Sequence, residues 1–150
     1  MNDEYYMSLA LQEAQKAYEV DEVPIGCVIV NDNQVIASTH NYCKQTGDPC
    51  AHAELLAIRE CVAKYGSQVL VNSSLYVTVE PCSMCAGAVV LAKIPRVIYG
   101  VLENKTGAVH TLFNILTHPA LNHRAQVRGG VLEHECCTLI RSFFVNKRGG

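Results

Sequence analysis

Several features that would place this chain in common protein classes are missing from its sequence. It has no apolar run of roughly eighteen residues or more, so no membrane-spanning helix is expected. The acidic start Met1-Asn2-Asp3-Glu4 does not resemble a secretory signal peptide. A net charge of -2 argues against general affinity for polyanions. These absences favour a cytoplasmic protein that does not bind nucleic acids nonspecifically.

The composition predicts a compact domain with reduced cysteines. A hydrophobic content of 49% suits a packed core, and the sequence has no linker, low-complexity tract or internal repeat. We therefore expect residues 1–150 to form a single domain that buries about 70% of its extended surface. Without an export signal, the eight cysteines are expected to be thiols, and only Cys82 and Cys85 have metal-binding spacing. Cys27 and Cys61 lie in apolar segments and are expected in the core.

Helical and strand patterns alternate along the chain. Apolar residues between Met7 and Tyr18 recur with the 3.6-residue period of an amphipathic helix. Residues 24–30 and 35–39, separated by four polar residues, predict a β-hairpin. The other predicted elements are a helix at 49–65, a strand at 74–79, a helix from Pro81 that ends before Pro95, a strand at 96–101, a weaker strand at 127–132 and a helix at 134–146. This order predicts an α/β fold, a three-layer α/β/α sandwich.

Two short motifs carry residues suited to chemistry. His52 and Glu54 stand in His-Ala-Glu, and Cys82 and Cys85 stand in Pro-Cys-Ser-Met-Cys. Cys-x-x-Cys alone also fits a redox pair or half of a structural zinc site, and His-Ala-Glu alone fits an ordinary helix start. Together they supply three zinc ligands and a carboxylate, and a catalytic zinc keeps three protein ligands with water in the fourth position. The pattern therefore favours one catalytic zinc per chain, held by His52, Cys82 and Cys85.

Glu54 is the predicted acid/base group of this site. Zinc lowers the pKa of a bound water from about 15.7 to about 7. The chemistry then needs a group that moves protons, and a positioned carboxyl contributes roughly 10²–10⁴-fold in that role.

The expected helix geometry limits where the metal can lie. Asp48 and Pro49 resemble an N-cap and a first helical residue, which places His52 about one turn into the helix. His52 and Glu54 do not share a helical face, so both can reach one metal only at the N-terminal end of that helix. Cys82 and Cys85 begin the next helix. Two helix N-termini, whose partial positive charge favours thiolates, are therefore expected to converge on the zinc.

The paired motif resembles the signature of the zinc-dependent deaminases. Further blocks resemble the bacterial tRNA-specific adenosine deaminase family over nearly the whole chain. They comprise residues 23–26, 48–54, 75–82, 96–97, 99–100, 105–108, 121–124 and 143–144. The resemblance implies a cytidine deaminase-like fold with a central five-stranded mixed sheet and a homodimer. It also implies zinc-dependent hydrolysis of the wobble adenosine of a tRNA anticodon to inosine and ammonia.

The resemblance also implies residues that contact the substrate. Asn41 matches a residue that hydrogen-bonds the target base, although by itself it reads more simply as a turn residue after a strand. Glu103 stands where the family usually has Asp, which keeps the carboxylate but lengthens the side chain. Cys50 stands where Thr or Asn is usual. Both departures are expected to affect how the anticodon loop sits.

The charges are divided unevenly between the two parts of the sequence. Residues 1–89 hold four Lys/Arg and eleven Asp/Glu, whereas residues 90–150 hold eight and three. The basic part could contact phosphates, or its charges could simply form solvated surface. The resemblance favours RNA contact by Lys105, Asn122 and Arg124, with Arg128 and Arg148 as weaker candidates.

Three functions stay open from sequence alone. The leading hypothesis is an adenosine deaminase that acts on the anticodon stem-loop of a tRNA. The alternative is a deaminase of free bases or nucleosides, such as guanine or cytosine. A noncatalytic zinc-binding partner subunit is the third, and Glu54 argues against it because a module that only binds metal needs no proton shuttle.

Overall fold

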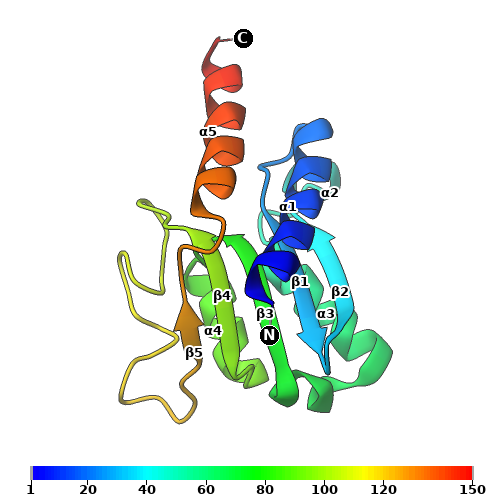
Figure 1. Ribbon diagram of the computed structural model, residues 1–150, viewed down its shortest axis with the longest axis vertical. Helices are drawn as coiled ribbons and strands as arrows, with labels where there is room; N and C mark the ends of the chain where they lie inside the picture. Colours follow the sequence, from blue (N-terminus) through cyan, green and yellow to red (C-terminus); the bar gives the residue numbers. More distant parts are fainter. Residues whose placement is uncertain (1, 150) are drawn as a thin grey trace.

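The computed structural model, shown in Figure 1, describes residues 2–149 and the side chains of residues 2–147. One sheet contains five strands in the order β2-β1-β3-β4-β5. The strands are β1 (Gly26–Asn31), β2 (Gln34–His40), β3 (Ser73–Val79), β4 (Arg96–Val101) and β5 (Gln126–Arg128). β1 pairs antiparallel with β2 and β3, whereas β4 pairs parallel with β3 and β5. The predicted five-stranded mixed sheet is confirmed.

Helices cover both faces of this sheet. α1 (Asp3–Glu19) and α5 (Glu133–Gly149) lie on one face, and α3 (Ala53–Tyr65) and α4 (Ser83–Ala92) lie on the other. Alternate residues of β1 point to opposite faces, as the strand period requires. Cys27 and Ile29 pack in the core with α3 and α4, whereas Val28 and Val30 pack in the core with α1. The three-layer sandwich is therefore confirmed, and none of the described helices has the length and apolar character to cross a membrane.

The predicted hairpin forms, and its first strand lies unusually close to α1. Its turn residues Asp32 and Asn33 have φ values of 50° and 61°, the left-handed conformation that two-residue hairpin turns use. A Cβ at Gly26 would lie 1.9 Å from the carbonyl oxygen of Ala10, so only glycine fits between β1 and this helix.

Two sequence-based boundaries are wrong. The helix predicted at 49–65 begins at Ala53, because the Asp48 Oδ1 atom accepts the Cys50 N–H at 2.9 Å and forms a turn instead of a helix cap. The strand predicted at 127–132 ends at Arg128, since the chain turns at Gly129 and Gly130, and the φ of Gly130 is 82°. Two short helices, α2 (Cys43–Thr46) and the 3₁₀ helix η1 (Ser67–Asn72), were not predicted.

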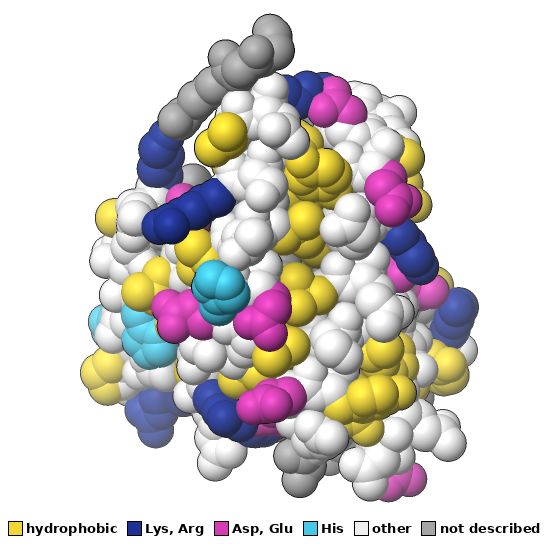
Figure 2. Space-filling view, turned by 45° about the horizontal axis from the view of Figure 1, so that its top comes forward, with side chains coloured by type: hydrophobic (Ala, Val, Ile, Leu, Met, Phe, Trp, Pro, Cys, Tyr) yellow, Lys and Arg dark blue, Asp and Glu magenta, His cyan; other side chains and the backbone are white. Residues whose placement is uncertain are grey.

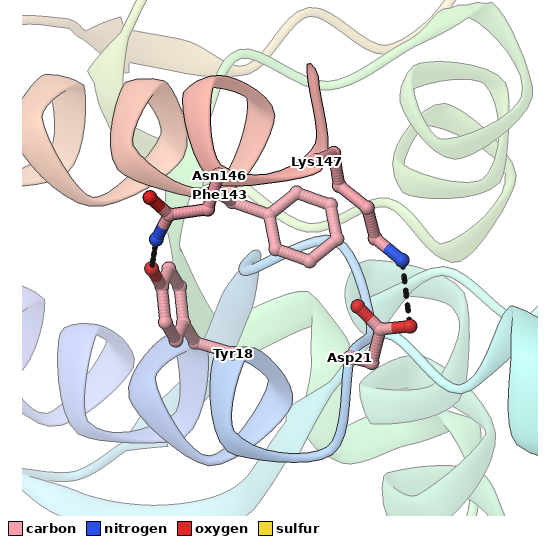
Figure 3. Close-up of a pocket in the computed structure, with 5 residues that line it drawn as sticks. All are labelled: Tyr18, Asp21, Phe143, Asn146 and Lys147. Atoms are coloured by element: carbon pink, nitrogen blue, oxygen red, sulfur yellow. Dashed lines mark hydrogen bonds and ion pairs between the residues drawn. The ribbon is translucent and has the colours of Figure 1, made fainter. Parts of the chain in front are cut away.

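α5 is held against the end of α1 by the contacts in Figure 3. The Tyr18 and Phe143 rings meet edge to face at 5.9 Å, and Asn146 donates a hydrogen bond to the Tyr18 hydroxyl. Lys147 Nζ lies 2.6 Å from Asp21 Oδ2, which also binds Lys44 of α2 at 2.5 Å. The hollow between these side chains contains none of the predicted zinc ligands.

A buried carboxylate ties the first turn of α1 to three strands. Asp3 is 3% exposed and accepts a bidentate hydrogen bond from Arg96 of β4, at 2.8 and 2.7 Å. It also accepts hydrogen bonds from the Tyr76 hydroxyl of β3 at 2.6 Å and from Arg128 of β5 at 2.8 Å. The hydrogen bond from Arg96 is the main reason that the pKa of Asp3 lies far below its usual value.

Candidate zinc centre and active site

The three predicted zinc ligands lie together at the starts of two helices. His52 is the N-cap residue of α3, Cys82 is the N-cap residue of α4, and Cys85 lies in the first turn of α4. Because α3 begins at Ala53, the prediction that His52 lies one turn inside the helix is wrong. Its backbone is extended, and its imidazole lies beside the two thiols.

The distances between the ligand atoms fit a zinc ion. His52 Nδ1 lies 3.5 Å from Cys82 Sγ and 3.7 Å from Cys85 Sγ, and all three ligand atoms lie within 4.8 Å of one another. Tetrahedral zinc with bonds of about 2.0–2.3 Å has edges of about 3.5–3.8 Å between such atoms. Among the described residues, no other group of three His, Cys, Asp or Glu side chains meets this condition. The set accounts for one zinc per chain.

Hydrogen bonds among the three ligand side chains shift the pKa values of the two cysteines in opposite directions. A hydrogen bond from Cys85 lowers the pKa of Cys82 to about 4, against the opposing effect of burial, and His52 adds a further hydrogen bond. The same hydrogen bond to Cys82, together with burial, raises the pKa of Cys85. Both cysteines bind zinc as thiolates, so metal affinity depends on pH.

Glu54 lies in the first turn of α3, two residues after His52, and is 4% exposed. Burial raises the pKa of its carboxyl group to about 7, and the charge of Cys82 acts in the same direction. A carboxyl group that titrates near neutrality can both accept and donate a proton at working pH. This is the property that a proton shuttle requires.

Asn41 holds the start of α3 in place. Its Oδ1 atom accepts the Ala53 N–H at 2.8 Å, and the residue is 5% exposed. A residue twelve positions upstream thus supplies the helix cap that His52 does not provide. Because Oδ1 is engaged in this way, a hydrogen bond from Asn41 to a substrate would come from Nδ2.

The sequence and the fold of this chain are similar to those of known zinc-dependent deaminases. Residues 1–101 match the model of the cytidine and deoxycytidylate deaminase zinc-binding region. The tRNA-specific adenosine deaminase of Streptococcus pyogenes serotype M1 is 46% identical over 93% of this chain and 82% of its own length. The tRNA-specific adenosine deaminase of Aquifex aeolicus is 43% identical over 99% of this chain and 97% of its own length. The chain belongs to the tRNA-specific adenosine deaminase family. A solved structure from a study of A-to-I editing by tRNA:A34 deaminases at the wobble position of transfer RNA is 41% identical, with a TM-score of 0.85 over 90% of this chain and 98% of that one.

Two further residues that the resemblance to this deaminase family implied lie together on the segment after β4. Glu103 Oε1 accepts the Lys105 N–H at 3.0 Å. Both line a hollow of about 370 Å³ together with Arg141 and Phe144 of α5. The segment thus presents a carboxylate and an ammonium group beside the Arg141 and Phe144 side chains of α5 on one surface of the deaminase.

Asn122 and Arg124 lie elsewhere in the deaminase. Both are exposed, and Arg124 donates to the Pro119 carbonyl at 2.9 Å. Arg124 lines a hollow with Ser73, at the start of β3, whereas Cys82 follows the end of that strand. A strand of seven residues spans roughly 20 Å, so Arg124 is far from the zinc ligands of its own chain.

The weaker candidates gain no support as RNA ligands. Arg128 is engaged with Asp3 at 2.8 Å. The side chain of Arg148 lies outside the described residues. On the face in Figure 2, Lys and Arg side chains are scattered among acidic ones and form no continuous basic track.

Two buried carboxylates near the site were missed from sequence. Glu22 is 1% exposed and accepts the Lys44 and Gln45 N–H groups at 3.0 and 2.7 Å, which fixes α2 beside the turn that leads to His52. Glu80 is 3% exposed and binds the segment after β4. The hydrogen bonds are between residues far apart in the sequence, so only the Glu-Pro-Cys context of Glu80 could have drawn attention to it.

Proposed function

We propose that this protein deaminates the wobble adenosine of a tRNA anticodon to inosine. The observation that carries the proposal is the buried Glu54 beside the cluster of His52, Cys82 and Cys85, in a chain whose relatives are tRNA-specific adenosine deaminases. A bound zinc would acidify water and so supply the nucleophile at neutral pH. Water adds to C6 of the adenine ring, the C6–N bond breaks, and the products are inosine and ammonia.

The protein's own groups move the protons in this reaction. Glu54 takes a proton from the attacking water and delivers it to ring nitrogen N1. It then takes the remaining proton of the hydroxyl group added at C6 and passes it to the amino group, so that the C6=O bond forms as ammonia leaves. Asn41 orients the base through Nδ2 while its Oδ1 atom holds the start of α3. A shift of the helix start would therefore move His52, Glu54 and the base contact together.

We further propose that the substrate is bound as an anticodon stem-loop by a homodimer in the cytoplasm. Bases in a loop are unpaired and can enter a pocket at low cost, so a protein with a net charge of -2 needs only a few placed contacts. Arg124, distant from the zinc ligands of its own chain, can serve a substrate held at the partner's site. Several apolar side chains are exposed, among them Leu91 (86% exposed) and Phe113 (58% exposed), and a second copy of the chain could bury them in a dimer interface.

The function is tested with tRNA transcripts that differ only at the wobble base. The zinc-loaded protein is incubated with each transcript and the product is sequenced for inosine. Glu54→Ala serves as the matched inactive control. Inosine at the wobble position of the adenosine transcript alone is the expected result. Faster turnover of free adenosine, guanine or cytosine than of the transcript would instead identify a small-molecule deaminase. Light scattering of the same sample checks the dimer.

A further inference from the structure

Glu80 occupies a junction between the zinc motif and the segment 102–111. It follows β3 directly and precedes Pro81 and Cys82, and it is 3% exposed. Its backbone N–H donates to the Val101 carbonyl at 2.8 Å, so its own backbone is fixed beside the end of β4. The side chain therefore leaves a rigid strand end and points into the protein, where a carboxylate must find hydrogen-bond donors.

The donors all come from the segment that follows β4. Glu80 Oε1 accepts the Glu103 N–H at 3.1 Å and the Thr111 hydroxyl at 2.5 Å. Oε2 accepts the N–H groups of Val109, His110 and Thr111 at 3.0, 2.8 and 3.0 Å. One carboxylate thus holds both ends of a nine-residue loop. Without it, four backbone N–H groups would lose their acceptor.

The same loop is also fixed against the zinc motif through its backbone. Ala108 N–H donates to the Pro81 carbonyl at 2.9 Å, and Gly107 forms a β-bridge with Cys82. A Cβ at Gly107 would lie 2.4 Å from Glu80 Oε1, so the loop passes directly over the carboxylate. Glu103 is itself the first end that Glu80 binds and is partly buried, whereas Lys105 is exposed and lies between the two ends.

We propose that Glu80 is a positioning residue that locks the loop 103–111 to the zinc motif and so sets where Glu103 and Lys105 meet the RNA. Glu80 takes no direct part in deamination, because both of its carboxylate oxygens accept hydrogen bonds from the protein's own donors. The proposal rests on the proposed function, since it assigns Lys105 to a phosphate of the substrate.

Glu80→Gln tests this with almost no change in side-chain volume. If the amide oxygen takes the place of Oε2, its NH₂ group faces the Glu103 N–H, and two donors oppose each other. If the amide is flipped, its NH₂ group instead faces the backbone N–H groups of residues 109–111, so donors again oppose each other. The substitution is therefore expected to loosen the Glu103 end of the loop. Glu19→Gln makes the same chemical change on an exposed residue at the end of α1 and is the matched control.

Three measurements, namely hydrogen exchange, KM and the salt dependence of tRNA binding, separate positioning from a general loss of stability. Hydrogen exchange is expected to accelerate at the amides of 103 and 109–111, while zinc content stays at one per chain. KM for the tRNA is expected to rise about 10-fold or more, as for loss of a hydrogen bond to a charged group. The salt dependence of tRNA binding should fall by about 1 in slope, as in Lys105→Ala, and the double variant should show no further fall. A structural defect alone would leave that slope unchanged.

Unchanged exchange at these amides, or an unchanged salt slope whatever the change in KM, would overturn the proposal. If Glu80→Gln does not fold, Thr111→Val decides the matter. It removes one donor of five, so it should raise exchange at 109–111 and KM in the same direction by a smaller factor, and no change in either would refute the role. If the unaltered protein binds no tRNA, the proposed function fails, whereas the exchange data still decide whether Glu80 holds the loop.

Discussion

Replacing Asp3 with asparagine should destabilise the protein by removing the charge that holds α1 to the sheet. Asp3→Asn keeps the size of the side chain, but one of the two oxygens that accept from Arg96 becomes an NH₂ group. Removing one member of a buried ion pair costs about 3–5 kcal/mol. Because the Arg96 and Arg128 side chains are 26% and 56% exposed, water can solvate them in part. We therefore expect a loss of about 2–3 kcal/mol at pH 7, or about 4–12 °C in Tm.

The effect should depend on pH in one direction. The folded-state pKa of Asp3 lies far below its ordinary value of 3.8, so its stabilisation is complete above that value and is lost as pH falls toward the folded-state pKa. The difference between the unaltered protein and Asp3→Asn should thus be constant from about pH 7 to about pH 5. Below about pH 4 it should shrink by about 1.4 kcal/mol per pH unit.

Urea unfolding at each pH provides the measurement, with Glu4→Gln as the control. Glu4 is an exposed carboxylate in the same helical turn, so its substitution should change stability by no more than about 0.5 kcal/mol. Any zinc release at low pH affects all variants alike and cancels in the difference. Equal stability of Asp3→Asn and the unaltered protein at pH 7, or a difference that persists undiminished at about pH 2, would refute the reasoning.

Three further predictions concern the zinc centre and the substrate. Cys82→Ala and Cys85→Ala should each lose both zinc and deaminase activity, measured by metal analysis and inosine formation; full activity in the presence of a chelator would contradict a hydrolytic zinc mechanism. Glu54→Ala should retain zinc, fold and RNA affinity but lower single-turnover deamination by at least about 10²-fold, and loss of its zinc would instead make Glu54 a ligand. Lys105→Ala should weaken tRNA binding and reduce its salt slope by about 1 with zinc content unchanged, whereas binding without any salt dependence would argue against phosphate contact.

The zinc set was predictable because its members lie in two short, regularly spaced motifs. His52, Cys82 and Cys85 were identified from their residue types and spacing together with the resemblance to the zinc deaminase signature. The alternation of helices and strands was sufficient to predict the three layers. The start of α3 was not predictable in the same way. Asp48 and Pro49 have the residue types of a helix start, but the structure takes the cap from Asn41, twelve residues away in the sequence.

The buried carboxylates illustrate the same limit more strongly. Asp3, Glu22 and Glu80 are acidic residues that a sequence reader assigns to solvent, because such residues are rarely buried unless they are paired. Their partners lie 20 or more positions away, as with Arg96 for Asp3 and Thr111 for Glu80. Periodicity and local motifs carry no information on such pairs, so their positions emerged only once the strands were placed side by side.

The Asp3 cluster has a consequence for how the protein is made. Asp3 and Arg128 are 125 residues apart, and ribosomes add about 5–20 residues per second, so roughly 6–25 s separate the synthesis of these two partners. During that interval the carboxylate of Asp3 lacks its contact with the edge strand. The first turn of α1 can reach its final ion pairing only after β5 has emerged. The last strand to be synthesised therefore completes the anchoring of the first helix, and the nascent chain depends on its later part to finish folding its beginning.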